Sequence, residues 1–296
     1  MPAAKSAAKK RSVRLAAFAK VNLCLHVLGK RPDGYHELRT IFQAISLHDT
    51  LELSLIPKAG IELELTDPTL PAGPENLVYR AIEAIGREIG FRGGIRARLE
   101  KHIPVARGLG GGSSDAAVAL IGMLRLTKKR VPLARLMEIA AGLGADVPFF
   151  LNPKPAHVRG IGERCEPLGH IAELFLLIAV PPVEVATASV YRDLRREHWS
   201  GLAPPGDISA IIEGRLGREH LVNDLEQVAL ARFPQIGEAK KLVEAAGARA
   251  AAMTGSGSGV FGIFNSSEEA ARASQEIRNR APYVRTFTAS ALQHSW

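Results

Sequence analysis

The chain has 296 residues, of which 46% are hydrophobic and 23% charged, which is typical of a soluble globular protein with room for two domains. Its longest apolar run, residues 175–183, is too short to span a bilayer, and its 5% aromatic residues form no pattern typical of an RNA-binding surface. The formal net charge of +8 suits a polyanionic small molecule, and two cysteines without metal-ligand spacing favour a reducing cytoplasm, so we expect neither a membrane nor a nucleic-acid partner.

A basic segment opens the chain and a long strand follows it. We expect residues 1–14 to form a disordered extension, because basic residues dominate it and no apolar signal-peptide run comes next. Alternating apolar residues predict that 13–28 form one long strand or a bent pair of strands. Lys20 interrupts this alternation, and its spacing alone favours a solvated lysine at a strand edge.

A turn at residues 31–34, with the sequence Arg-Pro-Asp-Gly, comes next. Tyr35 and His36 follow it directly, and such a pair is most often an ordinary part of the surface. The alternating segments 51–55 and 61–65 predict two strands, which we expect to pair as a hairpin.

The most informative stretch is residues 104–117, which contains four glycines within five residues. A half-buried strand is predicted before it, at 95–100, and a helix after it, from Ala116, with residues 113–115 as N-cap candidates. The order strand, glycine loop, helix N-terminus creates a site for phosphate, since unpaired N–H groups point at whatever lies over the loop. A tight turn without a ligand is the alternative. The loop lacks the Gly-Lys-Ser/Thr of a Walker A motif and the downstream acidic residue of a dinucleotide fingerprint.

The remaining elements follow from periodicity and breakers. Asp146 follows a helix that ends at Gly144, and it could simply cap the next turn; Thr187 could likewise be an ordinary N-cap. The glycines at 255, 257 and 259 could form only a hairpin turn. One predicted helix begins at Asn76, and further predicted helices span residues 133–143, 187–194, 221–248 (with a break at 233–234) and 268–277. The predicted strands span residues 172–180, 250–254, 260–264 and 284–289.

The glycine stretch resembles the ATP loop of the GHMP kinase superfamily, P-x-x-x-G-L-G-S/G-S-S. The stretches FAKVNLCLHVLGKRPDGYHEL, GADVPFF, NDLE and TGSGSGVFG extend this similarity over residues 18–264. The lengthened form GLGGGSS looks like one family member, which acts on a cytidine diphosphate derivative. The resemblance implies a two-domain α/β fold, with an N-terminal ribosomal-protein-S5-like domain containing a left-handed βαβ unit and a C-terminal ferredoxin-like domain. We place them at 15–165 and 166–296, with the substrate site between them.

The resemblance also implies roles for individual residues. It makes Lys20 and Asp146 catalytic, with Asp146 accepting the proton of the substrate hydroxyl or orienting that hydroxyl. Mg²⁺ would arrive with ATP, and Ser114 is a possible side-chain ligand. The ATP-binding residues implied are Pro104, Val105, Ala106, Arg107, Gly108, Leu109, Gly110, Gly111, Gly112, Ser113, Ser114, Asn76 and Lys101. The substrate-binding residues implied are Asn22, Tyr35, His36, Thr187 and Gly257.

Other activities remain open on the sequence. A superfamily kinase acting on mevalonate, homoserine or a sugar would share the loop, although it has no use for the stretch Asp33–His36. A non-catalytic nucleotide-binding regulator would keep the loop without the chemistry, and the presence of both Lys20 and Asp146 argues against it. We expect small-molecule partners, ATP and the cytidine diphosphate derivative, and a monomer or weak homodimer.

Overall fold

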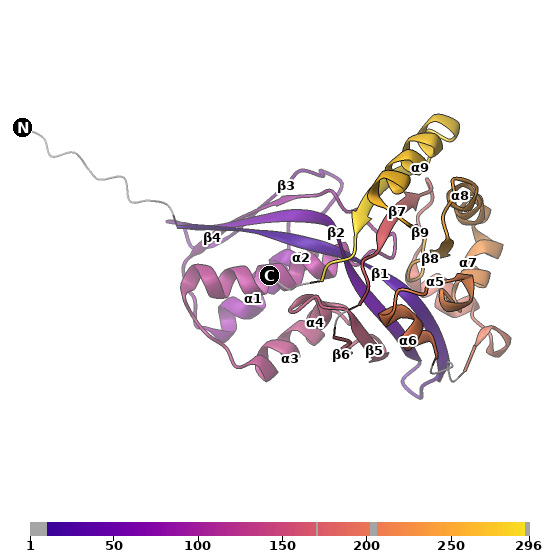
Figure 1. The fold of residues 1–296 in the computed structure, drawn as a ribbon. Helices are drawn as coiled ribbons and strands as arrows, with labels where there is room; N and C mark the ends of the chain where they lie inside the picture. The colour runs from indigo at the N-terminus through magenta and orange to yellow at the C-terminus, as the bar shows by residue number, and fades with distance from the viewer. Residues whose placement is uncertain (1–10, 170, 202–205, 294–296) are drawn as a thin grey trace, which may run out of the picture.

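The fold is that of a computed structural model, which describes residues 11–169, 171–201 and 206–293. The described residues form two sheets with helices packed against them, and the long β1–β2 ribbon of the first sheet packs against the second (Figure 1). No helix among the described residues is long and apolar enough to cross a membrane. The strands of the first sheet lie within residues 12–167 and those of the second within residues 175–290.

The first sheet has six strands in the order β3-β4-β2-β5-β6, with β1 paired to β2. Only β3 and β4 run parallel; the other pairs are antiparallel. Its strands are β1 (Ser12–Lys30), β2 (His36–Ile56), β3 (Gly60–Leu65), β4 (Gly94–Glu100), β5 (Ala156–Gly160) and β6 (Arg164–Pro167).

The prediction of one long strand at the start of the chain is confirmed by β1. The predicted tail is too long, because Ser12–Arg14 already pair with the end of β2, where Val13 lies opposite Leu53. Residues 1–10 of that predicted tail lie outside the described residues. Register shifts at three places, such as that between Asn22 and Cys24, bend the ribbon as it passes from one domain to the other.

The predicted hairpin of residues 51–55 with 61–65 is wrong. β4 lies between β2 and β3, pairing antiparallel with the first and parallel with the second. A helix, α1 (Leu77–Glu88), makes the crossover that parallel strands require. The reason for the order is burial: Ile95, Ala97 and Leu99 of β4 are fully buried and need neighbours on both sides, whereas β3 is only half-buried and suits an edge.

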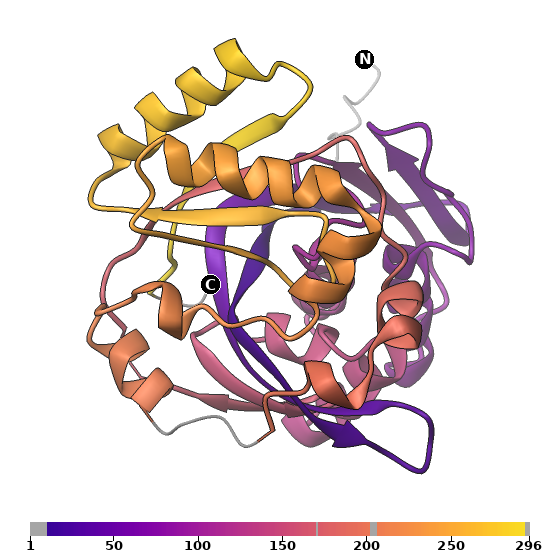
Figure 2. The same ribbon diagram turned by 90° about the vertical axis from the view of Figure 1, so that its right-hand side faces the viewer.

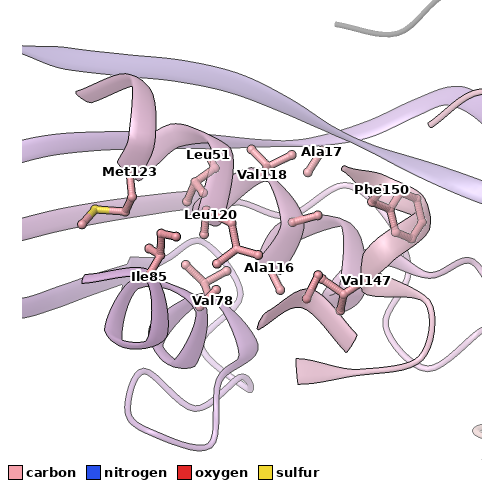
Figure 3. Packing of buried hydrophobic residues seen from close by; sticks show 14 of the residues in the cluster. Ala17, Leu51, Val78, Ile85, Ala116, Val118, Leu120, Met123, Val147 and Phe150 are labelled. Carbon is pink, nitrogen blue, oxygen red and sulfur yellow. The ribbon is translucent and has the colours of Figure 1, made fainter. Parts of the chain in front are cut away.

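The core of the first domain is built around α2 (Gly111–Thr127), which packs between the sheet and α1. Figure 3 shows Ala116, Val118 and Leu120 of α2 among side chains from the sheet and from α1. The predicted helix α3 (Leu133–Leu143) is confirmed, and α4 (Val147–Phe150) follows it. Burying a large apolar side chain of this kind contributes roughly 1.5–3 kcal/mol, so this core fixes where α2 begins.

The second sheet has the order β10-β7-β9-β8, with all neighbours antiparallel (Figure 2). Its chain order, strand–helices–strand–strand–helix–strand, confirms the predicted ferredoxin-like domain. The strands are β7 (Phe175–Val180), β8 (Ala250–Met253), β9 (Val260–Phe264) and β10 (Arg285–Ser290). The helices are α5 (Thr187–Asp193), α6 (Gly206–Ile212), α7 (Glu226–Arg232), α8 (Pro234–Ala245) and α9 (Ser267–Arg280), with 3₁₀ turns at Arg196–His198 and Arg218–His220.

The last strand of the first sheet ends at Pro167, and the domain boundary at 165 stays a prediction. The helix predicted from 221 begins only at Glu226, because the Asn223 side chain turns back to accept a hydrogen bond from the Leu225 backbone. The predicted break at Phe233–Pro234 is confirmed between α7 and α8.

Candidate active site

A cavity of about 1040 Å³ lies where the β1–β2 ribbon, the glycine loop and α5 meet. It brings together nearly all the residues singled out in the sequence, from both domains. Two of them do not line it: Ser114 is fully buried in α2, and Gly257 faces Met253. The predicted site residues on its wall are Lys20, Asn22, Tyr35, His36, Asn76, Lys101, residues 104–113, Asp146 and Thr187.

The glycine loop starts α2 earlier than expected. Gly110 is the N-cap, with a left-handed φ of +70°, and no side chain caps the helix, so the prediction that residues 113–115 cap it is wrong. Those residues form the first turns of the helix instead. Gly108 also has a left-handed φ, and a Cβ there would lie 2.1 Å from the Thr254 carbonyl oxygen. Glycine is therefore required at these two positions by backbone conformation and close packing.

Both domains hold the loop in place through hydrogen bonds. The backbone N–H of Lys20 donates to the Leu109 carbonyl at 2.9 Å, which ties the loop to β1. The Thr254 hydroxyl donates to the Gly108 carbonyl at 3.2 Å, which ties it to the second domain. With its carbonyls engaged in this way, the loop presents the N-terminus of α2, whose first N–H groups have no partner within the helix, to the cavity.

Lys20 and Asp146 meet at the cavity wall. The Lys20 ammonium lies 3.6 Å from Asp146 Oδ2, donates to Asn22 Oδ1 at 2.6 Å and sits over the Phe42 ring. The lysine is buried, so it is not the solvated edge residue that spacing alone favours. Burial lowers the pKa of Lys20, and the charge of Asp146 acts in the opposite direction.

Asp146 precedes α4, but its side chain makes no capping hydrogen bond, so the structural alternative for this residue is wrong. Its side chain is 30% exposed, which leaves the carboxylate accessible from the cavity. Burial, reinforced by this negative charge, raises the pKa of Tyr191 and also that of Cys165, the latter to about 12. The negative charge of Asp146 thus acts on both of these side chains.

Asn22 joins three elements behind Lys20. Its amide nitrogen donates to the Thr40 hydroxyl at 2.8 Å, and its backbone N–H donates to the Thr254 hydroxyl at 3.0 Å. Its side-chain oxygen accepts from Lys20. The side chain is therefore fully engaged, and it positions the lysine.

Lys101 is held between two carboxylates that the sequence did not suggest as its partners. Its ammonium lies 2.5 Å from Asp49 Oδ2 and 2.8 Å from Asp115 Oδ2. Asp49 also accepts the backbone N–H groups of His102 and Ile103. Burial raises the pKa of Asp115 to about 8, against the opposing effect of Lys101. No local pattern in the sequence brings these three side chains together.

The Asn76 side chain caps α1, accepting from the Val78 N–H at 2.9 Å and donating to the Pro71 carbonyl. The prediction that α1 begins here is confirmed. Asn76 also lines the cavity.

The end of the cavity beside the Arg31–Gly34 turn is aromatic. His36 is buried and stacks on Tyr191 of α5 with ring centroids 5.4 Å apart, and Trp199 meets it edge-on at 6.1 Å. Tyr35 is 62% exposed at the rim. Burial, followed by the charge of Lys30, lowers the pKa of His36, so this ring is neutral at pH 7. Tyr191 and Trp199 were not predicted as site residues, because nothing in the neighbouring sequence except their aromatic character indicates such a role.

Thr187 is the first residue of α5, and Ala186 occupies the N-cap position. Thr187 is therefore not the cap that was the alternative for it. Its hydroxyl lies 2.8 Å from that of Ser256, in the turn between β8 and β9. In that turn Gly255 and Ser256 line the cavity, whereas a Cβ on Gly257 would meet the Met253 sulfur at 2.8 Å. Gly255 and Ser256 of this turn therefore face the cavity, whereas Gly257, the residue predicted to bind substrate, does not.

Two cations on the cavity wall have no carboxylate partner among the described residues, Lys30 at the end of β1 and Arg192 in α5. The other three, Lys20, Lys101 and Arg107, are each within an ion pair. Uncompensated positive charge therefore concentrates at the rim near His36. Such charge attracts an anionic ligand.

A metal-binding cluster of three or more His, Cys, Asp or Glu side chains is not found in the described parts of the chain. The Ser114 hydroxyl is buried and has no hydrogen-bond partner among the described residues. Ser114 does not line the cavity, so its role as a side-chain ligand of Mg²⁺ stays a prediction.

Comparison with known proteins places this site in a family. The model described as "GHMP kinases N terminal domain" matches residues 76–153, and "GHMP kinases C terminal" matches 208–282. The 4-diphosphocytidyl-2-C-methyl-D-erythritol kinase of Geobacter metallireducens is 43% identical over 92% of this chain and 96% of its own length, and that of Citrifermentans bemidjiense is 44% identical over 90% and 95%.

Solved structures agree with these relatives. A crystal structure of 4-(cytidine 5'-diphospho)-2C-methyl-D-erythritol kinase has a TM-score of 0.83 and 37% identity, covering 94% of this chain and 99% of its own. A homoserine kinase from Cytophaga hutchinsonii has a TM-score of 0.74 at 20% identity, covering 98% of both chains. The second similarity is one of fold alone.

Proposed function

The chain belongs to the GHMP kinase family, and from this premise we propose that it transfers the γ-phosphoryl of ATP to the 2-hydroxyl of 4-diphosphocytidyl-2-C-methyl-D-erythritol. It is an ATP-dependent phosphotransferase with an alcohol group as acceptor. Relatives named for this activity match it over about nine tenths of its length. The reaction belongs to the non-mevalonate route to isoprenoid precursors.

The observation that carries the proposal is one cavity with three parts. It contains the glycine loop, the Lys20–Asp146 pair and an aromatic, cationic rim. Each part matches a part of the reaction: a triphosphate, a reacting hydroxyl and a cytidine diphosphate. Phosphoryl transfer depends mainly on positioning and on stabilising spread negative charge, which these parts supply.

The loop residues 108–113 would bind the β- and γ-phosphates through backbone N–H groups and the α2 N-terminus. Mg²⁺, bound with ATP, would neutralise phosphate charge and be held mainly by phosphate oxygens and water, with Ser114 behind the loop as the one predicted side-chain ligand. Lys101 and Asn76 line the same cavity.

Asp146 would accept the proton of the substrate hydroxyl or orient that hydroxyl toward the γ-phosphorus. Lys20, 3.6 Å away, would stabilise the negative charge that develops during transfer. Because Asn22 holds the lysine from the other side, the ammonium is positioned before substrate binds.

Tyr35, His36 and Tyr191 would bind the cytosine ring by stacking and by a hydrogen bond from the neutral histidine. Stacking of a base on an aromatic ring is worth about 1–3 kcal/mol. Lys30 and Arg192 supply uncompensated positive charge for the diphosphate. A cytoplasmic location and a monomer or weak homodimer stay predictions from the sequence.

A coupled ADP-release assay tests the proposal. Purified protein with Mg·ATP is given 4-diphosphocytidyl-2-C-methyl-D-erythritol, with mevalonate, homoserine and galactose in parallel. We expect turnover with the cytidylyl substrate alone. Turnover with another alcohol would overturn the substrate assignment, and ATP binding without turnover on any of them would favour a nucleotide-binding regulator.

A further inference from the structure

The indole nitrogen of Trp199 has no role in the proposed phosphoryl transfer. The Trp199 side chain lines the cavity and meets His36 edge-on, with 6.1 Å between ring centroids. Its indole N–H is buried and has no hydrogen-bond partner within the described parts of the chain. A buried indole N–H usually finds a partner, and leaving one unsatisfied costs roughly 1–3 kcal/mol. The side chain lines the cavity while its indole N–H is hidden, so a small rotation of the ring would bring this unsatisfied donor to an acceptor on a bound ligand.

The residue after Trp199 is anchored firmly. Ser200 donates its backbone N–H to Asp224 Oδ2 at 2.9 Å and its hydroxyl to Asp224 Oδ1 at 2.7 Å. Asp224 also accepts the Val27 N–H at 2.7 Å, which ties this segment to β1. The carboxylate is buried, so these hydrogen bonds persist without competition from bulk water. They fix the backbone next to Trp199 relative to the ribbon.

The group formed by His26, Ser200 and Asp224 superficially resembles a hydrolytic triad. The order of contacts excludes that role, because the serine lies between the other two: its hydroxyl contacts both His26 Nδ1 and Asp224. In a hydrolytic triad the histidine lies in the middle, where it takes the serine proton. The group therefore has a structural role: it holds the segment at Ser200 against β1. It also gives a role to the NDLE stretch, which contains Asp224.

We propose that Trp199 contacts the cytidylyl part of the substrate, donating its indole N–H to an acceptor there and closing the base site beside His36. Asp224, acting through Ser200, is a positioning residue for Trp199. Cytosine offers carbonyl and ring-nitrogen acceptors. The identity of the ligand rests on the proposed function; the assignment of a donor to this wall rests on the geometry.

Intrinsic fluorescence tests this directly, because the chain has only two tryptophans, Trp199 and Trp296. In a Trp296→Phe background, cytidine 5'-diphosphate should change the emission of Trp199 saturably, and ADP should change it far less. Absence of any change at concentrations well above the substrate KM would overturn the proposal without any variant at 199.

A variant at position 199 tests how much the indole N–H contributes to substrate binding. Trp199→Phe keeps a ring but loses the donor, so KM for the cytidylyl substrate and Kd for cytidine 5'-diphosphate should rise about tenfold. The KM for ATP and kcat should stay within about twofold. Asp224→Asn should raise the same KM by less and shift Trp199 emission to the red. Tyr283→Phe, at an exposed ring outside the cavity, is the control and should change nothing.

The outcomes separate this inference from the proposed function. Wild-type turnover with unchanged constants in Trp199→Phe would overturn the inference and leave the function standing. No wild-type turnover, together with tight cytidine 5'-diphosphate binding that Trp199→Phe weakens, would support the inference and overturn the function. An equal rise in the KM values for both substrates would mean a general structural role and would contradict the proposal.

Discussion

At the scale of single residues, Lys20 and Asp115 are two buried titratable groups beside the cavity that are held in different ways. Lys20 keeps its ammonium between Asn22 and the partly exposed Asp146, at the place where the proposed transfer would develop negative charge. Asp115 is buried beside Lys101, and one of its oxygens has no hydrogen-bond partner among the described residues. We propose that Lys20 takes part in the phosphoryl transfer, whereas burial of the Asp115 carboxylate destabilises the folded protein when that group is ionised.

Asp115 should make stability depend on pH. Its pKa in the folded protein is raised by burial to about 8, well above the value of 3.8 for an ordinary aspartate. Its contribution to stability is therefore fully present below pH 3.8 and is lost as pH rises through about 8. Asp115→Asn cannot ionise, so it removes this loss of stability with rising pH, while its amide oxygen still accepts a hydrogen bond from Lys101.

The stability of Asp115→Asn relative to wild type should thus improve between pH 6 and pH 8.5, by on the order of 2 kcal/mol. Thermal unfolding of both proteins at the two pH values measures it. Asp193→Asn, at a half-exposed surface residue, is the matched control and should show no such trend. A relative stability that stays level or falls with pH would contradict the account of Asp115.

At the scale of elements, the glycine loop and the β8–β9 turn form one unit, although 146 residues separate Gly108 from Thr254. The turn supplies the carbonyl and hydroxyl against which Gly108 packs. Because Gly108 has a left-handed φ and a backbone oxygen close to where a Cβ would be, no other residue fits without moving the loop.

Gly108→Ala should therefore displace the loop, weaken ATP binding at least about tenfold and lower the melting temperature by several degrees. Gly142→Ala, at a helical position with open space around its Cβ, is the control and should leave ATP binding unchanged. Calorimetric titration with ATP and thermal unfolding give both readouts. Wild-type ATP affinity in Gly108→Ala would show that the loop geometry is not required.

The same elements show what a sequence can predict. Periodicity and breakers located α1, α3 and the strand-rich second domain, because those signals are local. The place of β4 within the sheet and the start of α2 depend on packing against distant segments, and both were predicted wrongly. Lys20 shows the limit most clearly, since its spacing indicated a solvated residue, whereas the structure buries it; only the family resemblance implied a role at the active centre.

At the scale of the whole molecule, the β1–β2 ribbon joins two cores. Leu51 of the ribbon packs in the core of the first domain, whereas Leu25 and Val27 pack in that of the second. The cavity lies along this ribbon, with the glycine loop contributed by one domain and α5 by the other. The lining residues come from both domains, which is why no single segment of sequence contains the cavity.

We propose that the Lys20–Asp146 pair performs the transfer of the γ-phosphoryl group. The most direct test is the kcat of Asp146→Asn and Lys20→Met with the cytidylyl substrate, beside the Kd for ATP of each variant. We predict that each kcat falls at least about a hundredfold, with ATP affinity within about twofold of wild type. Asp193→Asn serves again as control. Wild-type turnover in either variant would contradict the account.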